Sequence, residues 1–265
     1  IPPFGTLQSI NAWTNAFTIA FVYAILAIGL NVVIGFAGLL DLGYAAFFAL
    51  GGYTYALLAS PFFGVHLPFW PVLIFGALIG AVFGVLLGAP TLRLRGDYLA
   101  IVTLGFGEIV PLTLLNADKF TAGTIGIGGI DKPSLPVLGE FTLLNPWPFY
   151  ILILAMLALV VIVVFRLEDS KVGRAWEAIR EDELAAESSG INTVVSKLQA
   201  FAVGAAIAGF AGVFNAAKLT VVEPDMFGFI VSVSTRSAVV LGGMGNVVGV
   251  GVGAFVIYLI QSILL

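Results

Sequence analysis

The chain has 265 residues, of which 60% are hydrophobic and 10% charged, with a mean hydropathy of +1.11 and a net charge of −4. No charged residue precedes Asp41, and the next one along the chain is Arg93. A helix needs roughly 20 apolar residues to cross a bilayer core about 30 Å thick, and the chain supplies such stretches repeatedly. This excludes a water-soluble domain and predicts an all-α, polytopic transmembrane helical bundle. A transmembrane β-barrel is excluded because the apolar stretches do not alternate with polar residues.

Residues for several classes of chemistry are missing from the sequence. With no cysteine and a single histidine, His66, it lacks the means for disulfides, thiolate metal sites and histidine clusters. No lysine follows a glycine, so the phosphate-binding loop that ends in Gly-Lys-Ser/Thr is absent. We therefore expect no catalytic site, metal or cofactor in this chain. The small, dispersed net charge also argues against nucleic acid as a partner.

Eight apolar segments follow one another along the chain, and we assign them to one transmembrane domain, residues 1–265. The second and the seventh are short and glycine-rich, which is typical of broken or re-entrant helices that line a cavity. The first residues lack a signal-peptide pattern and the chain stops within an apolar run, so we expect further helices beyond both ends. The segments are residues 17–36, 43–60, 69–90, 98–115, 148–165, 198–216, 227–246 and 249–265.

The positions of lysine and arginine predict how the chain is oriented, because short cytoplasmic loops hold an excess of both. Arg93 and Arg95 lie in one loop, and five further basic residues lie between 166 and 197. Two crossings separate these loops, so we place both in the cytoplasm, and we place the opening segment there too. Residues 116–147 and 217–226 are then predicted to be external loops.

Small residues recur every four positions in three of the segments. On a helix this spacing clears one face of side chains, so that a neighbouring backbone can approach closely. Close helix packing is the main interpretation, and a pore-lining face is the alternative. The three series are Gly76, Gly80, Gly84 and Gly88; Gly204, Ala208 and Gly212; and Gly245, Gly249 and Gly253.

Residues 171–192 hold eight of the 26 charged side chains and predict an amphipathic helix over about 172–188. The face of this helix that carries Val172, Trp176, Ile179 and Ala186 is largely apolar. Five acids between Glu177 and Glu187 outweigh one arginine there, so anionic lipid would repel the helix. We therefore expect a cytoplasmic protein partner. Charged residues spaced for pairing three or four positions apart are Arg174, Glu177, Arg180 and Glu181.

Long stretches of the sequence resemble one family of membrane proteins. "VGRAWEAIREDELAAESSGIN" followed by "KLQAFAVGAAIAGFAGVFNA" is similar to the coupling region and next helix of branched-chain amino acid ABC transporter permeases of the LivM type, an inner-membrane component. Three other stretches agree: "GLNVVIGFAGLLDLGYAAFFALGGYTYALL", "LRLRGDYLAIVTLGFGEIV" and "VVLGGMGNVVGVGVGAF". The resemblance implies a related second permease subunit, two cytoplasmic ATPase subunits and an external or periplasmic amino-acid-binding protein as partners.

The resemblance also implies roles for residues in the cytoplasmic segment, about 166–197. The Glu-Ala-Ala…Gly motif of importer permeases maps onto Ala185, Ala186 and Gly190. Leu184 stands where the glutamate of the motif would be, with Glu183 one position earlier. Our hypothesis is that residues 171–192 form the helix that couples to the ATPase, with Trp176 and Ile179 facing its groove. The predicted coupling residues are Arg174, Trp176, Glu177, Ile179, Arg180, Glu181, Ala185, Ala186 and Gly190.

Several polar residues fall within or beside apolar segments, where a charge at the bilayer centre costs about 2.5–3.5 kcal/mol. Glu108 lacks the arginine that permeases of this family commonly have where Pro111 stands, and Arg236 stands where they are usually apolar. One hypothesis pairs the two across the bundle. The alternatives are pairing of Glu108 across a subunit interface and an Arg236 side chain that reaches the membrane surface. The candidate pathway residues are Asn31, Asp41, Gly43, Tyr44, Glu108 and Arg236.

Two interpretations of residues 41–52 stay open: a helix break that lines the pathway and a cytoplasmic turn between two complete crossings. The function predicted from the resemblance is that of a permease subunit of a binding-protein-dependent ABC importer in the bacterial cytoplasmic membrane. It would admit branched-chain or other neutral amino acids, with ATP hydrolysed by its partners. The alternatives are a permease for urea or small amides and an ion-coupled secondary carrier.

Overall fold

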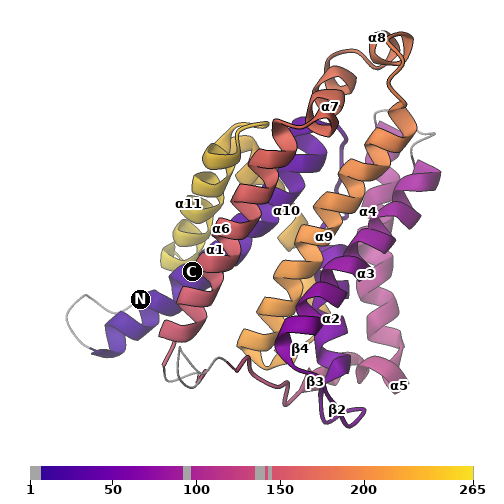
Figure 1. Ribbon diagram of the computed structural model, residues 1–265. Helices are drawn as coiled ribbons and strands as arrows, with labels where there is room; N and C mark the ends of the chain where they lie inside the picture. Colours follow the sequence, from indigo (N-terminus) through magenta and orange to yellow (C-terminus); the bar gives the residue numbers. More distant parts are fainter. Residues whose placement is uncertain (1–6, 92–96, 135–140, 143–144, 265) are drawn as a thin grey trace.

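The computed structural model describes the chain except for residues 1–6, 92–96, 135–140, 143–144 and 265. The described residues form a helical bundle with two short β-ribbons (Figure 1), which confirms the all-α prediction. The long helices are α1 (Leu7–Asn31), α2 (Ala45–Leu58), α3 (Phe69–Thr91), α4 (Asp97–Asn116), α6 (Trp147–Glu168), α9 (Thr193–Leu219), α10 (Phe229–Gly242) and α11 (Val247–Leu264). The short helices are α5 (Asp118–Thr121), α7 (Lys171–Glu181) and α8 (Glu183–Ser188), with a π-helix η1 (Val32–Phe36) and 3-10 turns η2 (Gly123–Ile125) and η3 (Pro224–Phe227).

Each of the eight predicted apolar segments contains one long helix. Six helical spans are long and apolar enough to cross a membrane on their own, and α2 and α11 are shorter apolar helices. The seventh segment qualifies only when η3 is counted together with α10, as the span Pro224–Gly242. The prediction that the second segment is short is therefore confirmed, since α2 has 14 residues, whereas the seventh reaches the length of a crossing, 19 residues, together with η3.

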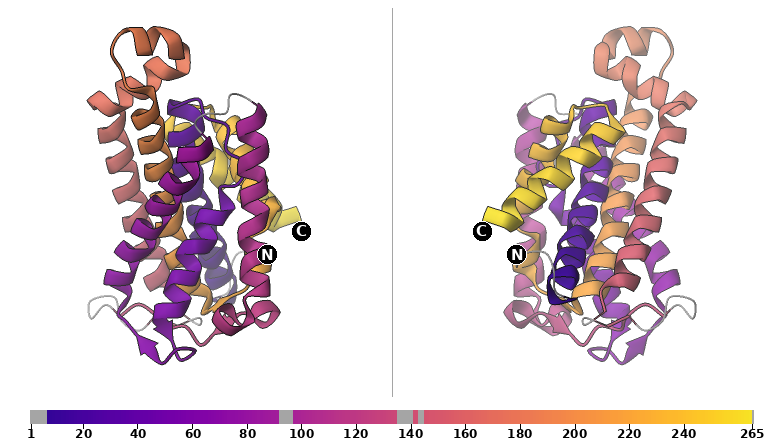
Figure 2. Two further views of the ribbon diagram at one scale, coloured as in Figure 1. Left: turned by 90° about the vertical axis from the view of Figure 1, so that its right-hand side faces the viewer. Right: turned by 90° about the vertical axis from the view of Figure 1, so that its left-hand side faces the viewer.

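The two ends of the bundle differ in structure. Helices α7 and α8 project beyond one end, where α3 ends and α4 begins (Figures 1 and 2). The opposite end carries two antiparallel ribbons, β1 (Ala59–Ser60) with β2 (Val65–His66) and β3 (Ile127–Gly128) with β4 (Val221–Val222). The two loops expected in the cytoplasm therefore share an end, and β3 and β4, from the two loops predicted to be external, pair at the other. Arg93 and Arg95 lie outside the described residues.

The placement of the opening segment on the side of α7 is wrong. The Lys218 side chain, near the end of α9, donates a hydrogen bond to the carbonyl oxygen of Asn15, 3.2 Å away. Since α9 begins beside α8 and runs the length of the bundle (Figure 1), the early part of α1 lies at the opposite end. The physical reason is that three segments, an odd number, lie between the start of α1 and the loop after α3.

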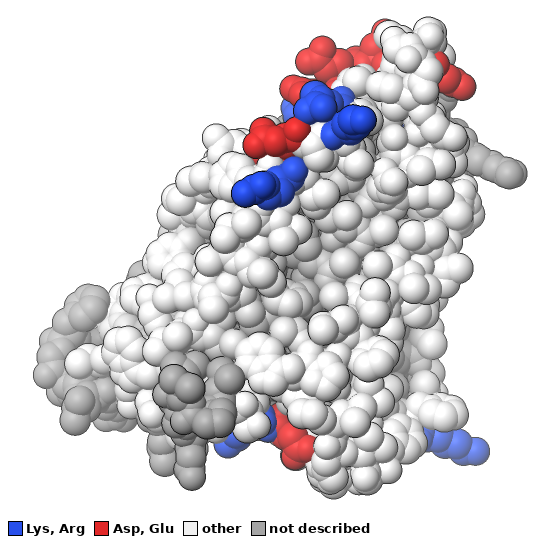
Figure 3. All heavy atoms as spheres, viewed as in Figure 1, with Lys and Arg blue, Asp and Glu red and all other residues white. Residues whose placement is uncertain are grey.

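Charged side chains gather at the two ends of the bundle on the face that Figure 3 shows, and the band between them is uncoloured. The exposed residues of α3 in this band are apolar, among them Ile74, Leu78 and Val82. Those of α6 include Leu159 and Ile162. A band of apolar surface between two charged ends is what a bilayer requires, because the hydrocarbon core offers charged groups no hydration.

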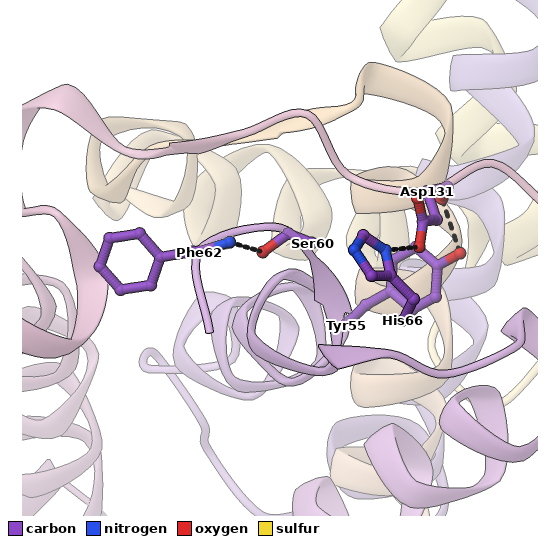
Figure 4. Close-up of polar contacts among 5 residues, drawn as sticks. All are labelled: Tyr55, Ser60, Phe62, His66 and Asp131. Carbon is purple, nitrogen blue, oxygen red and sulfur yellow. Dashed lines mark hydrogen bonds and ion pairs between the residues drawn. The ribbon is translucent and has the colours of Figure 1, made fainter. Parts of the chain in front are cut away.

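The end opposite α7 is held together by polar contacts between segments far apart in the sequence (Figure 4). His66 Nδ1 lies 2.6 Å from Asp131 Oδ2, and the Tyr55 hydroxyl donates to the Asp131 carbonyl oxygen at 2.7 Å. The backbone N–H of Asp131 in turn donates to the carbonyl of Ala59. The loop between α4 and α6 is thereby fastened to the end of α2 and to the β1–β2 ribbon.

Close packing on α9 explains two of the three series of small residues, because the series of α3 faces α9 and the series of α9 faces α1 and α2. A Cβ atom on Gly80 would overlap the carbonyl oxygen of Ala205, and one on Gly212 would overlap that of Phe48. Gly209, which is outside the series, packs in the same way against the carbonyl oxygen of Gly76. The third series packs α11 on α10, where a Cβ atom on Gly249 would overlap the Gly242 carbonyl oxygen. The interpretation as close helix packing is therefore confirmed at these positions, whose cleared faces are filled by neighbouring backbone.

Adding one methyl group at Gly209 is expected to push α3 away from α9. Overpacking of this kind costs about 1–3 kcal/mol, so we expect Gly209→Ala to lower the free energy of unfolding of the detergent-solubilised protein by that amount. Gly105→Ala on α4 is the matched control, because a Cβ atom there meets nothing within 4 Å and alanine is the better helix former. Equal stability of the two variants in thermal unfolding would contradict this account.

Candidate functional site

The charged segment folds as two helices and not as the single predicted one. Helix α7 ends at Asp182, whose extended backbone (φ −154°, ψ 109°) separates it from α8. The Asp182 carboxylate accepts hydrogen bonds from the backbone N–H groups of Leu184 and Ala185 and so caps the start of α8. The Ser170 hydroxyl accepts from Val172 and Gly173 in the same way at the start of α7. Side-chain caps of this kind stabilise a helix start by about 1 kcal/mol.

The apolar face of α7 is buried in the chain itself. Trp176 is fully buried, and its indole Nε1–H donates to the carbonyl oxygen of Ser196 at 2.7 Å. Ile179 is buried beside it, and Gly173 packs against carbonyl groups at the end of α6. The expectation that Trp176 and Ile179 face an ATPase groove is therefore wrong, because this face anchors α7 to α6 and α9.

The outer face of α7 and α8 is acidic and accessible. Of the predicted coupling residues, Arg174, Glu177, Glu181, Ala185 and Gly190 are exposed, and Ala186 is buried. Figure 3 shows acidic side chains gathered on this projecting end. The exposed acids on the two helices are Glu177, Glu181, Asp182 and Glu187.

The charge pairs expected along α7 do not form among the described residues. Arg174 instead donates to the carbonyl oxygen of Asp169 at 2.7 Å, at the end of α6, where a cation is favoured by the helix dipole. The ion pair that does form joins α8 to α9, with Lys197 Nζ 2.5 Å from Glu183 Oε1. Glu183 is thus the acid that fastens the segment. The sequence signals neither this pair nor the Trp176–Ser196 bond, because both cross a turn between two helices.

Arg180 connects α7 to the interior of the bundle. Its guanidinium Nη1 donates to the carbonyl oxygen of Gly35, the last but one residue of η1, at 2.5 Å. A Cβ atom on Gly38, which has a positive φ of 68°, would lie 3.0 Å from Arg180 Cγ. One on Gly245, in the turn between α10 and α11, would lie 3.1 Å from Arg180 Nη1. One side chain of the predicted coupling set therefore lies against η1, the start of the helix break and the α10–α11 turn.

The chain between η1 and α2 is a break inside the bundle. Residues 37–44 are buried except at Gly38 and partly at Leu40 and Leu42. Asp41 is buried, and its Oδ1 accepts a hydrogen bond from the Gly43 N–H at 2.9 Å. A non-helical break therefore lies between η1 and α2, where the glycines and the aspartate predicted one, and its place in the pathway stays a prediction.

Groups on α4, α9 and α10 and in the α10–α11 turn form hydrogen bonds with residues at and beside this break. The Leu42 N–H donates to Thr103 Oγ1 of α4, and the Ala45 N–H donates to Ser232 Oγ of α10, each at 3.0 Å. The Tyr44 hydroxyl donates to the Gly204 carbonyl of α9 at 2.7 Å. Asn31, at the end of α1, accepts through its Oδ1 from the Gly245 N–H at 2.9 Å. Asn31, Asp41, Gly43 and Tyr44, four of the six candidate pathway residues, therefore belong to one site.

The other two candidate pathway residues, Glu108 and Arg236, lie outside this site. Glu108 is exposed on α4, and Arg236 is half-buried on α10. Within the described part of the chain, ion pairs are formed only by His66 with Asp131 and by Lys197 with Glu183. The hypothesis that Glu108 and Arg236 pair across the bundle is therefore wrong for this conformation, because neither residue takes part in one of these ion pairs.

Comparison with known proteins gives these features a context. A family model described as "Branched-chain amino acid transport system / permease component" matches residues 13–265. The chain is 46% identical over 250 residues to the "High-affinity branched-chain amino acid transport system permease protein LivM" of Salmonella typhimurium. It is 45% identical over 249 residues to the protein of the same description from Escherichia coli K12.

Each of these two alignments covers 86% of this chain and 58% of the relative, so the chain spans a little over half the length of these relatives. A more distant relative, the "High-affinity branched-chain amino acid transport system permease protein LivH" of Escherichia coli K12, is 25% identical over 265 residues. That alignment covers 94% of this chain and 83% of LivH. No solved structure matches the chain.

Removing one member of the Lys197–Glu183 pair is expected to loosen α8. The Lys197 side chain is 10% exposed and that of Glu183 37%, so Glu183→Gln leaves a buried ammonium without its counter-ion, at a cost of about 1–3 kcal/mol. We expect faster hydrogen exchange of the α8 amides in this variant. Glu187→Gln, which neutralises an exposed acid of the same helix, is the control. Equal exchange in both variants would show that the ion pair does not hold α8.

Proposed function

The chain belongs to the family of branched-chain amino acid transport system permease components, and from this we infer that it is a permease subunit of a binding-protein-dependent ABC importer. The proposed substrates are branched-chain or other neutral amino acids, and the proposed location is the bacterial cytoplasmic membrane. The observation that carries the proposal is the α7–α8 segment, a rigidly anchored acidic projection at one end of a transmembrane bundle.

A subunit of this kind depends on partners for energy. The chain has no Gly-Lys-Ser/Thr loop that could hold nucleotide, so ATP hydrolysis is assigned to cytoplasmic ATPase subunits. The exposed acids of α7 and α8 suit a basic groove on such a partner and disfavour contact with anionic lipid. The coupling role is therefore assigned to the outer face of these helices, with Glu177, Glu181 and Ala185 as contacts, and not to Trp176 or Ile179.

Mechanical coupling needs a connection from this face to the helix break, and Arg180 supplies one. Trp176 and the Lys197–Glu183 pair hold α7 and α8 on the ends of α6 and α9. Arg180 then connects α7 to η1 and to the α10–α11 turn. A displacement of α7 by a docked ATPase would therefore act on η1 and on the α10–α11 turn at once.

The walls around the break offer little that could select a substrate. Around Asp41 the small internal cavity is lined mainly by apolar side chains, among them Phe47, Phe106 and Phe201. Strong discrimination between substrates requires several placed polar groups. Specificity is therefore assigned to an external binding protein, with the permease as a gated route.

Uptake into proteoliposomes tests the proposed function. The vesicles would contain this subunit, its related permease and the ATPases, with ATP in the lumen and the binding protein outside. We expect uptake of leucine or another neutral amino acid that requires both ATP and the binding protein. Uptake of urea alone would assign the chain to the small-amide permeases. Uptake driven by an ion gradient without ATP would overturn the importer proposal.

Neutralising Arg180 is expected to uncouple ATP hydrolysis from transport. Loss of its charge-assisted hydrogen bond to Gly35 costs about 1.5–3 kcal/mol, so Arg180→Gln should lower the amount of substrate imported per ATP hydrolysed about tenfold or more. ATPase subunits should still co-purify with this variant, because the acidic outer face is unchanged. Arg174→Gln removes an arginine of the same helix that contacts only the end of α6, and should leave the ratio near that of the wild type. Loss of ATPase binding in Arg180→Gln would contradict the internal role.

A further inference from the structure

Two charged side chains lie at membrane depth without a partner in the described part of the chain. Glu108 lies near the middle of the span Tyr98–Asn116, and Arg236 lies in the span Pro224–Gly242. Glu108 is exposed and Arg236 half-buried. A charged side chain that faces hydrocarbon at the bilayer centre costs about 2.5–3.5 kcal/mol. The surfaces of α4 and α10 that carry Glu108 and Arg236 are therefore poorly suited to contact with lipid.

The two charges lie at similar depth. Gly107, which precedes Glu108, packs against Gly43 at the helix break. Ser232 accepts the hydrogen bond from Ala45, two residues further along the same break, and Arg236 lies one helical turn beyond Ser232. A turn of four residues rises about 6 Å. An arginine side chain can span that distance, so the Arg236 guanidinium can reach the depth of Ser232.

This surface differs from the rest of the perimeter. Figure 2 shows α4 and α10 on the side of the molecule away from α6. Near Arg236, Ser237 is exposed, and Gln261 Nε2 of α11 lies 3.4 Å from Ser234 Oγ. On α3 and α6 the band between the charged ends is apolar (Figure 3). The polar groups at membrane depth therefore concentrate on one side.

A second candidate surface is a groove of about 520 Å³ between α1, α6 and α11. It is lined by apolar side chains, among them Phe21, Leu157 and Phe255. Lipid chains satisfy such a lining fully, so the groove has no need of a protein partner. The charges on α4 and α10 do have that need.

We propose that the α4–α10 face, which carries Glu108 and Arg236, is the surface that binds the second, related permease subunit. This inference rests on the proposed function. The chain resembles both LivM and LivH proteins over most of its length, so the two subunits of such an importer share a fold and can pack about an approximate two-fold axis. In the proposed assembly the second permease is the partner that lies at the same membrane depth. A face with an acid and a base at similar depth offers such a partner two charges to pair with, which lipid does not.

Photo-crosslinking in the assembled complex tests this surface. p-Benzoylphenylalanine would replace Leu112 or Val240, exposed residues one turn from Glu108 and Arg236. Val82 on α3 and Ile162 on α6, equally exposed on the apolar perimeter, are the matched control positions. We expect adducts with the second permease from the first pair and none from the controls. Adducts from the controls alone, or adducts with a second copy of this chain, would overturn the proposal.

The charges themselves are tested by co-purification. Glu108→Gln and Arg236→Gln each remove one of the two charges that the proposed interface pairs at membrane depth, so we expect recovery of the second permease to fall about tenfold or more. Recovery equal to the wild type in both variants would overturn the proposed pairing. If the wild type imports amino acids but cross-links elsewhere, the surface is wrong while the function stands. If the wild type recovers no second permease at all, both fail.

Discussion

The central constraint on this structure is the need to satisfy backbone polar groups where a helix breaks inside a bundle without water. Each unpaired N–H or C=O in such a place costs several kcal/mol. Between η1 and α2 the chain meets this need with side chains from distant helices, through Thr103 of α4 and Ser232 of α10. The break is therefore a junction that fixes how α2, α4 and α10 are placed.

The projecting helices depend on the same junction. α7 is anchored at its base by the Trp176 indole and connected to η1 by Arg180. The close approach of Arg180 to Gly38 and Gly245 requires that these positions lack side chains. Movement of α7 relative to η1 would break a charge-assisted hydrogen bond and disturb the α10–α11 turn. Helix α7, which projects beyond the end of the bundle, is thus connected to the least regular part of the interior of the bundle.

The sequence predicts what depends on composition and local spacing. Segment lengths follow from the bilayer thickness, and the glycine series follow from helical periodicity, so both agree with the structure. The direction in which Trp176 faces does not follow, because a tryptophan on an amphipathic helix suits a partner groove and an internal pocket equally well. The hydrogen bond that the Trp176 indole donates to Ser196 depends on how α7 folds back on α9. The end of α7 at Asp182 does not follow from the spacing of the charged residues, because the i+3 and i+4 spacing continues past it. The signal that could have located it is the aspartate itself, which is a common helix cap.

Where polar groups stay unsatisfied also follows from the break. Asn31 Nδ2 and Asp41 Oδ2 are buried and have no hydrogen-bond partner in the described part of the chain. A buried polar group without a partner costs about 1–3 kcal/mol relative to a hydrated one. Both groups belong to the break, so this junction holds some of the least favourable polar contacts in the bundle. Hydration of the break would relieve this cost, and the junction that places α2, α4 and α10 is therefore also a place where the bundle gains least from staying packed.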